Sequence, residues 1–201
     1  MNVLSLGFAA LLLGAPMAAH AAGGEGSPAY QKAIALFVDA AHAEGIDVAP
    51  APPQCLDFSK IQTQPNPKAD AALVSCRLDL PCARLMVAGA PDAPQTFAIT
   101  SHVDATICQE PRWAGYQRAF AAAFLHCGSD DGRAAALKVL ADSPLKIDDS
   151  AQSPTSDPRI EARPEALAFQ AACGAMTGIR RVRAASNGRN EDIVLKPVPQ
   201  P

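Results

Sequence analysis

Three nearly adjacent positions carry the residue types of a hydrolytic site. Ser101, His102 and Asp104 supply a hydroxyl nucleophile, a general base and an orienting carboxylate. Adjacent residues on one segment rarely converge on a shared reacting atom, and the Gly-x-Ser-x-Gly signature of a nucleophile elbow is missing. We therefore interpret this segment as a turn or strand surface. The alternative is a small enzyme with a scattered site around His102, Asp104 and His126.

The six cysteines could serve metal binding or disulfide bonding, and they are Cys55, Cys76, Cys82, Cys108, Cys127 and Cys173. Structural zinc requires clustered Cys and His at short spacing, but the close pair Cys76 and Cys82 has no histidine beside it. An even number of cysteines in an exported chain is typical of disulfides. The sequence therefore predicts disulfides and no metal site. It predicts no cofactor either, since a glycine-rich phosphate loop is missing.

An export signal is predicted over residues 1–21. An apolar run precedes the small-x-small sequence Ala19-His20-Ala21, as at a signal-peptide cleavage site. The apolar run is shorter than the roughly 20 residues that cross a bilayer, so we expect cleavage near Ala21 and no stable membrane anchor. We assign residues 22–196 to one mature domain and 197–201 to a flexible tail, in the periplasm or outside the cell.

A central helix is predicted over Pro111–Gly128. Its aromatic side chains and its last cysteine recur at helical spacing, so they form one stripe that must face a core: Trp113, Tyr116, Phe120, Phe124 and Cys127. Cys108 and Cys127 stand at the two ends of this helix, about 24 Å apart, beyond the roughly 7 Å reach of a disulfide. We prefer Cys127 with Cys173, two helical positions that could face each other, and the pairing of the other four cysteines stays open.

Capping signals predict further helices. Ser27 and Pro28 begin a helix that runs to about Glu44, and Asn66 and Pro67 begin another that continues toward Cys76. Asp130 or Asp131 caps a helix over 133–141, and a last helix begins near Pro164. These elements predict a mainly α fold, a small disulfide-braced domain of about four to five helices.

Two short segments and the C-terminal region leave room for β-hairpins. Cys82–Ala88 and Thr96–Val103 are too short for their periodicity to decide between helix and strand. After Ile179, two apolar runs flank Asn187-Gly188, which is typical of a hairpin with a tight turn. We therefore allow one or two short hairpins beside the helices.

Charge is uneven along the chain. The net charge of −3 argues against broad binding to nucleic acid or anionic lipid. The C-terminal hairpin is locally basic, and we consider four of its arginines as partner-binding candidates: Arg180, Arg181, Arg183 and Arg189. The simpler interpretation is an ordinary strand surface whose cations pair with nearby carboxylates.

These observations favour an exported protein-binding module, such as an inhibitor or immunity-type protein of an envelope-directed enzyme. A rigid, braced scaffold loses little entropy when it binds another protein, whereas the residues show no convincing catalytic constellation. The two alternatives are the scattered-site enzyme and a periplasmic carrier of an apolar small molecule bound between helices.

Overall fold

The computed structural model describes residues 26–48, 52–57, 74–146 and 163–198. Its strands are β1 (Gln54–Asp57), β2 (Val74–Asp79), β3 (Ala83–Ala90), β4 (Ala93–Val103), β5 (Leu145–Lys146), β6 (Met176–Ala185) and β7 (Gly188–Pro197). Its helices are α1 (Pro28–Ala43), α2 (Glu110–Phe124), α3 (Asp130–Asp142) and α5 (Pro164–Cys173). The predicted signal segment 1–21 lies outside the described residues.

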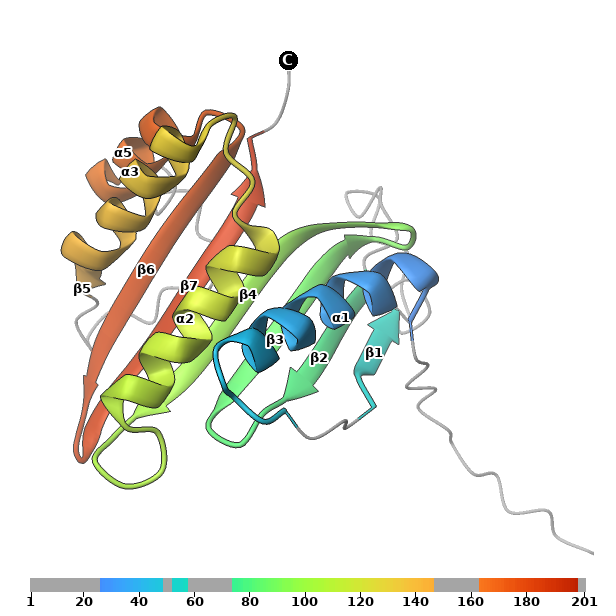
Figure 1. The fold of residues 1–201 in the computed structure, drawn as a ribbon, viewed down its shortest axis with the longest axis horizontal. Helices are drawn as coiled ribbons and strands as arrows, with labels where there is room; N and C mark the ends of the chain where they lie inside the picture. Colours follow the sequence, from blue (N-terminus) through green and yellow to red (C-terminus); the bar gives the residue numbers. More distant parts are fainter. Residues whose placement is uncertain (1–25, 49–51, 58–73, 147–162, 199–201) are drawn as a thin grey trace, which may run out of the picture.

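The seven strands form one sheet in the order β1-β2-β3-β4-β7-β6-β5. Neighbouring strands are antiparallel except for β5 and β6, which pair in parallel. The helices lie over one face of this sheet, with α1 beside α2 and α3 beside α5 (Figure 1). We call this the helix-covered face, and the opposite side the second face.

The prediction of a mainly α fold is wrong, because 39% of the described residues are helical and 37% are in strands. The segment toward Cys76, predicted as the end of a helix, is strand β2, while the expected start of that helix lies outside the described residues. Val74, Cys76 and Leu78 are buried, and the residues between them are not. This alternation has the two-residue period of a strand with one face in a core.

Both undecided segments are strands, and they form the β3–β4 hairpin. Leu85 of β3, Ile99 of β4 and Ile193 of β7 lie in register across the sheet and are all buried. β-Branched and leucine side chains at alternate positions fit a pleated, half-buried surface. The pairing of these segments with other strands makes them strands, which local periodicity alone could not show.

The α1 prediction is confirmed in its bounds, and the helix buries one face, which consists of Tyr30, Ala33, Ile34, Phe37 and Ala41. Helix α2 also buries the predicted aromatic stripe from Trp113 to Phe124. It ends earlier than expected, because Leu125 takes an extended conformation, so Cys127 lies in the connection to α3. The stacked rings of Phe97 and Phe124, with centroids 4.3 Å apart, join β4 to α2.

The predicted C-terminal hairpin is confirmed as β6 and β7, which are joined through a turn at Ser186 and Asn187. The helix predicted after Asp130 or Asp131 is α3. Its cap is Ser129, one residue before Asp130, because the Ser129 hydroxyl accepts from the Gly132 amide. Strand β7 continues to Pro197, the first residue of the expected tail, and residues 199–201 lie outside the described part.

Three disulfides connect the six cysteines. Cys127–Cys173 is the pair that we preferred, and it connects the segment between α2 and α3 to the end of α5. The other two pairs are Cys55–Cys76, between β1 and β2, and Cys82–Cys108, between the β2–β3 turn and the segment before α2. Three disulfides fit an oxidising environment outside the cytosol. None of the helices in the described ranges is long and apolar enough to cross a membrane.

Candidate functional site

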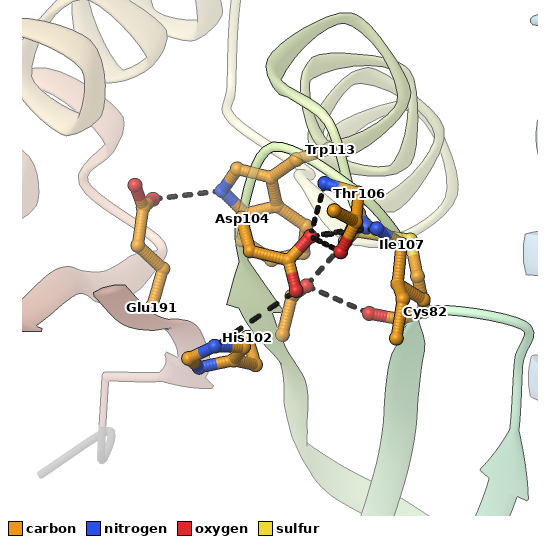
Figure 2. The surroundings of a disulfide bond; sticks show 9 residues. Cys82, His102, Asp104, Thr106, Ile107, Trp113 and Glu191 are labelled. Atoms are coloured by element: carbon orange, nitrogen blue, oxygen red, sulfur yellow. Dashed lines mark hydrogen bonds and ion pairs between the residues drawn. A yellow bond between two sulfur atoms is a disulfide. The ribbon is translucent and has the colours of Figure 1, made fainter. Parts of the chain in front are cut away.

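The connection from β4 to α2 is a short loop organised by one carboxylate. We call residues 104–109 the Asp104 loop. The Asp104 Oδ1 atom accepts from the amides of Thr106 (2.8 Å), Ile107 (2.6 Å) and Cys108 (3.3 Å) (Figure 2). The Asp104 amide in turn donates to the Cys108 carbonyl at 3.2 Å. The hydrogen bond from the Ile107 amide, followed by that from Thr106, holds the pKa of Asp104 below its ordinary value.

A disulfide anchors the same loop to the β2–β3 turn. Cys108 is fully buried and bonded to Cys82. The Ser101 hydroxyl lies beside this bond, 3.1 Å from the Cys108 sulfur, and donates to the Cys82 carbonyl at 2.7 Å. The loop therefore has a covalent connection in addition to its internal hydrogen bonds.

The β6–β7 turn supports the other side of the Asp104 loop. The two lie side by side at one end of the sheet (Figure 1). A Cβ atom at Gly188 would lie 2.2 Å from the Val103 carbonyl oxygen, so only glycine allows this close approach. The His102 ring bridges to the turn, with Nδ1 2.9 Å from the Asn190 Oδ1 and Nε2 3.1 Å from the Asn187 Oδ1.

The tip of this braced loop is apolar. Ile107 is 64% exposed, which exceeds the exposure of every other large hydrophobic side chain in the described residues. A single exposed apolar side chain is common, but this one is attached to a backbone amide that Asp104 fixes. The geometry therefore presents an apolar group in a defined position, which suits contact with another molecule.

The candidate catalytic residues do not converge. Ser101 is buried toward the helix-covered face, and His102 follows it on β4 with its side chain toward the second face. The Nε2 atom of His102 lies 4.0 Å from Asp104, beyond a hydrogen bond, and Asp104 is engaged by backbone amides. His126 is exposed beyond the far end of α2, about 20 Å away along a helix of this length. Their arrangement serves structure, and a catalytic role for them stays untested.

A second carboxylate, Glu191 of β7, is buried beneath α2. The Glu191 carboxylate accepts from the Trp113 indole at 2.7 Å, from Gln117 at 3.3 Å and from the Arg180 Nε at 2.9 Å (Trp113 in Figure 2). Arg189 also pairs with it and reaches outward to Glu110. We call these residues the Glu191 cluster.

The electrostatics of Glu191 follow from these partners. Burial alone would raise the pKa of Glu191, but the hydrogen bonds from Arg180, Trp113 and Arg189 outweigh it and lower the pKa. Glu191 is only 1% exposed, so the carboxylate is an ion held inside the protein by its donors. The cluster connects β6 and β7 to α2 and contributes to stability.

The four candidate partner-binding arginines lie on both faces of the C-terminal hairpin. Arg180 and Arg189 belong to the Glu191 cluster. Arg181 is 5% exposed and pairs with Asp192, whose pKa is raised because burial outweighs that pairing. Arg183 is also engaged in an interaction. Partner binding through these arginines stays untested, and intramolecular pairing was the simpler interpretation of their pattern.

The second face carries a hollow of about 730 Å³ near His102. Its described lining includes the pairs Arg84–Asp79 and Arg181–Asp192. The lining also includes Ser101 and His102, but the Ser101 hydroxyl donates to the Cys82 carbonyl and the His102 ring contacts Asn187 and Asn190, so the two side chains are not paired as nucleophile and base. Within the described ranges, no group of three or more His, Cys, Asp or Glu side chains is placed to hold a metal ion.

Sequence reasoning missed the roles of Ile107 and Glu191. A signal for the loop was present, because an aspartate followed by Thr106 at the second position is typical of an Asx turn. No local signal connects Glu191 to Trp113, which lies 78 positions earlier. The sequence matches no protein-family model and no curated protein, and the structure matches no solved structure.

Proposed function

We propose that this chain is an exported protein-binding module that makes contact through the Asp104 loop. The observation that supports this proposal best is that Ile107 is exposed to solvent while its backbone is held in place. This apolar side chain is 64% exposed, and its own backbone amide donates to the Asp104 carboxylate at 2.6 Å. Large apolar anchors that enter a pocket of the partner supply much of the affinity of protein interfaces.

The bracing of the loop supports the same function. Binding costs free energy whenever a loop must be ordered, and a loop fixed beforehand avoids that cost. Hydrogen bonds to Asp104, the Cys82–Cys108 disulfide and the β6–β7 turn all restrict the Asp104 loop. These constraints surround one exposed apolar tip, so Ile107 is held in place before any partner binds.

We also propose a compartment and a class of partner for this protein. The disulfides fit an oxidising compartment, so we propose the periplasm or the exterior, after removal of residues 1–21 near Ala21. An inhibitor or immunity-type protein of an envelope-directed enzyme fits a small, rigid protein that binds through one protruding loop. The Ile107 side chain would then enter an apolar pocket of that enzyme.

Site-specific photocrosslinking tests this proposal. A photoreactive residue replaces Ile107 in one sample and Leu167 in a matched one, since Leu167 is also exposed, at 51%, but lies on α5. We expect one discrete adduct with an exported protein at position 107 and none at position 167. Equal adduct patterns at both positions would contradict the proposal, and a turnover abolished by His102→Ala or His126→Ala would favour the enzyme instead.

A further inference from the structure

The helices cover the sheet as two pairs, and a slot remains between the pairs. Helix α1 packs on α2, and α3 packs on α5, while the floor between α2 and α3 consists of β6 and β7 (Figure 1). This slot has a volume of about 270 Å³. It lies along α2, away from the Asp104 loop at the start of that helix, so it is a separate feature from the proposed contact surface.

The body of the slot is apolar. Phe120, Ala121 and Leu125 of α2 form one wall, and Leu140 of α3 forms the other. Ile193 and Leu195 of β7 form its floor, and all six of these side chains are at least 93% buried. Apolar walls with a few polar groups at one end are the usual composition of a small-molecule site.

The polar groups of the slot are hydrogen-bond donors. Arg180 lies at the floor, and Gln117 and Arg118 belong to the α2 wall. The Nε and Nη2 atoms of Arg180 bind Glu191, whereas Nη1 lies 3.5 Å from the Leu140 carbonyl and 3.3 Å from the Ala141 carbonyl. Both Nη1 distances exceed the usual 2.7–3.2 Å, so these two contacts are weak and leave donor capacity.

The charge of the lining is one-sided. Among the described residues that line the slot are two guanidinium groups and no carboxylate, since Glu191 lies behind Arg180 and Glu44 binds Arg118 outside. A carboxylate that replaced the weak Nη1 contacts would gain charge-assisted hydrogen bonds, which are about twice as strong as neutral ones. The lining therefore favours an anionic end group over a neutral or cationic one.

We infer that the slot binds an unbranched apolar molecule that ends in a carboxylate. The tail lies against Phe120, Leu140 and Leu195, and the carboxylate accepts from the Arg180 Nη1. At about 30 Å³ for each non-hydrogen atom, the volume of one liquid water, the slot holds roughly nine to ten such atoms. A saturated carboxylate of about seven or eight carbons, which has nine or ten non-hydrogen atoms with its two oxygens, matches this size.

A chain-length series tests the size of the ligand. Hexanoate, octanoate, decanoate and tetradecanoate are titrated into the disulfide-bonded mature chain by calorimetry. We expect affinity to rise about tenfold from hexanoate to octanoate, because each buried methylene adds a similar increment, and no further for decanoate or tetradecanoate. No saturable binding of octanoate at millimolar concentration, or affinity that keeps rising with length at the same rate, would overturn the inference.

Two comparisons test the position and charge of the site. Octan-1-ol should bind about tenfold more weakly than octanoate, because it lacks the charge that Arg180 recognises. Ala141→Trp, at the mouth of the slot, should weaken octanoate binding at least tenfold, whereas Ala134→Trp, exposed on the same helix but outside the lining, should not. Equal affinities for the acid and the alcohol, or for the two tryptophan variants, would contradict the assigned site.

Discussion

Asp104 and Glu191 are both carboxylates with a lowered pKa, but they organise very different regions. Asp104 accepts from three consecutive backbone amides and shapes a loop that holds an apolar side chain outward. Glu191 accepts from side chains of α2, β6 and β7 and holds an ion inside the protein. The comparison shows that a carboxylate can fix the conformation of one loop when it binds backbone amides, and can hold separate elements of the fold together when it binds their side chains.

The largest expected effect on stability belongs to Glu191→Gln. Removing this buried charge leaves Arg180 and Arg189 without their shared carboxylate, and breaking a buried ion pair costs about 3 to 5 kcal/mol of unfolding free energy. Glu110→Gln is the matched control, since Glu110 pairs with Arg189 from an exposed position and should cost about 1 kcal/mol or less. Urea unfolding that shows equal costs for both would contradict the role of Glu191 as the buried charge that stabilises the fold.

The next largest effect is expected for the double substitution of Cys82 and Cys108 by serine. The Cys82–Cys108 disulfide spans 26 positions of sequence, and the loss of a disulfide of this span typically costs about 2 to 4 kcal/mol. Partner binding should weaken as well, because the Asp104 loop loses its anchor. A variant that unfolds more readily yet binds its partner with unchanged affinity would show that the brace serves stability alone.

The pH dependence should separate Glu191 from its neighbour Asp192. Because the folded pKa of Glu191 is lowered, its contribution is complete above its unfolded pKa of about 4.3 and is lost as pH falls through the folded pKa. The folded pKa of Asp192 is raised, so its titration has the opposite sign and favours the fold as pH falls. Glu191→Gln should therefore flatten the acid loss of stability, by at most about 1.4 kcal/mol per pH unit, and Asp192→Asn should steepen it. Unfolding free energies between pH 6 and pH 3 check both signs, and identical slopes for the two variants would contradict them.

A smaller effect, confined to the loop, is expected for Asp104→Ala. The amides of Thr106, Ile107 and Cys108 lose their shared acceptor, so their hydrogen exchange should become faster while exchange in the sheet stays unchanged. Asp104→Asn is the matched control, because its carboxamide oxygen can still accept, and it should restore most of the protection. Equal exchange in both variants would mean that the carboxylate does not organise this loop.

The sequence predicted those elements whose signals are local. Helix α1 has a serine at its N-cap position, a first-turn proline and a regular apolar stripe, and the C-terminal hairpin has Asn187 in its turn and Gly188 directly after it. Strands β2 to β4 were missed or undecided, because their pairing depends on partners far along the chain. Only the Glu191 cluster follows this rule, since it has no local signal, whereas the Asx turn at Asp104 has a local signal and was still missed.

The most direct test of the central proposal is the affinity of Ile107→Ala for the protein crosslinked at position 107. This substitution should leave the unfolding free energy within about 0.5 kcal/mol of the original, because the Ile107 side chain is 64% exposed. It should weaken the complex at least tenfold if Ile107 is the apolar anchor, whereas Leu167→Ala should not. Unchanged affinity of the Ile107→Ala variant would contradict the assignment of the Asp104 loop as the contact surface.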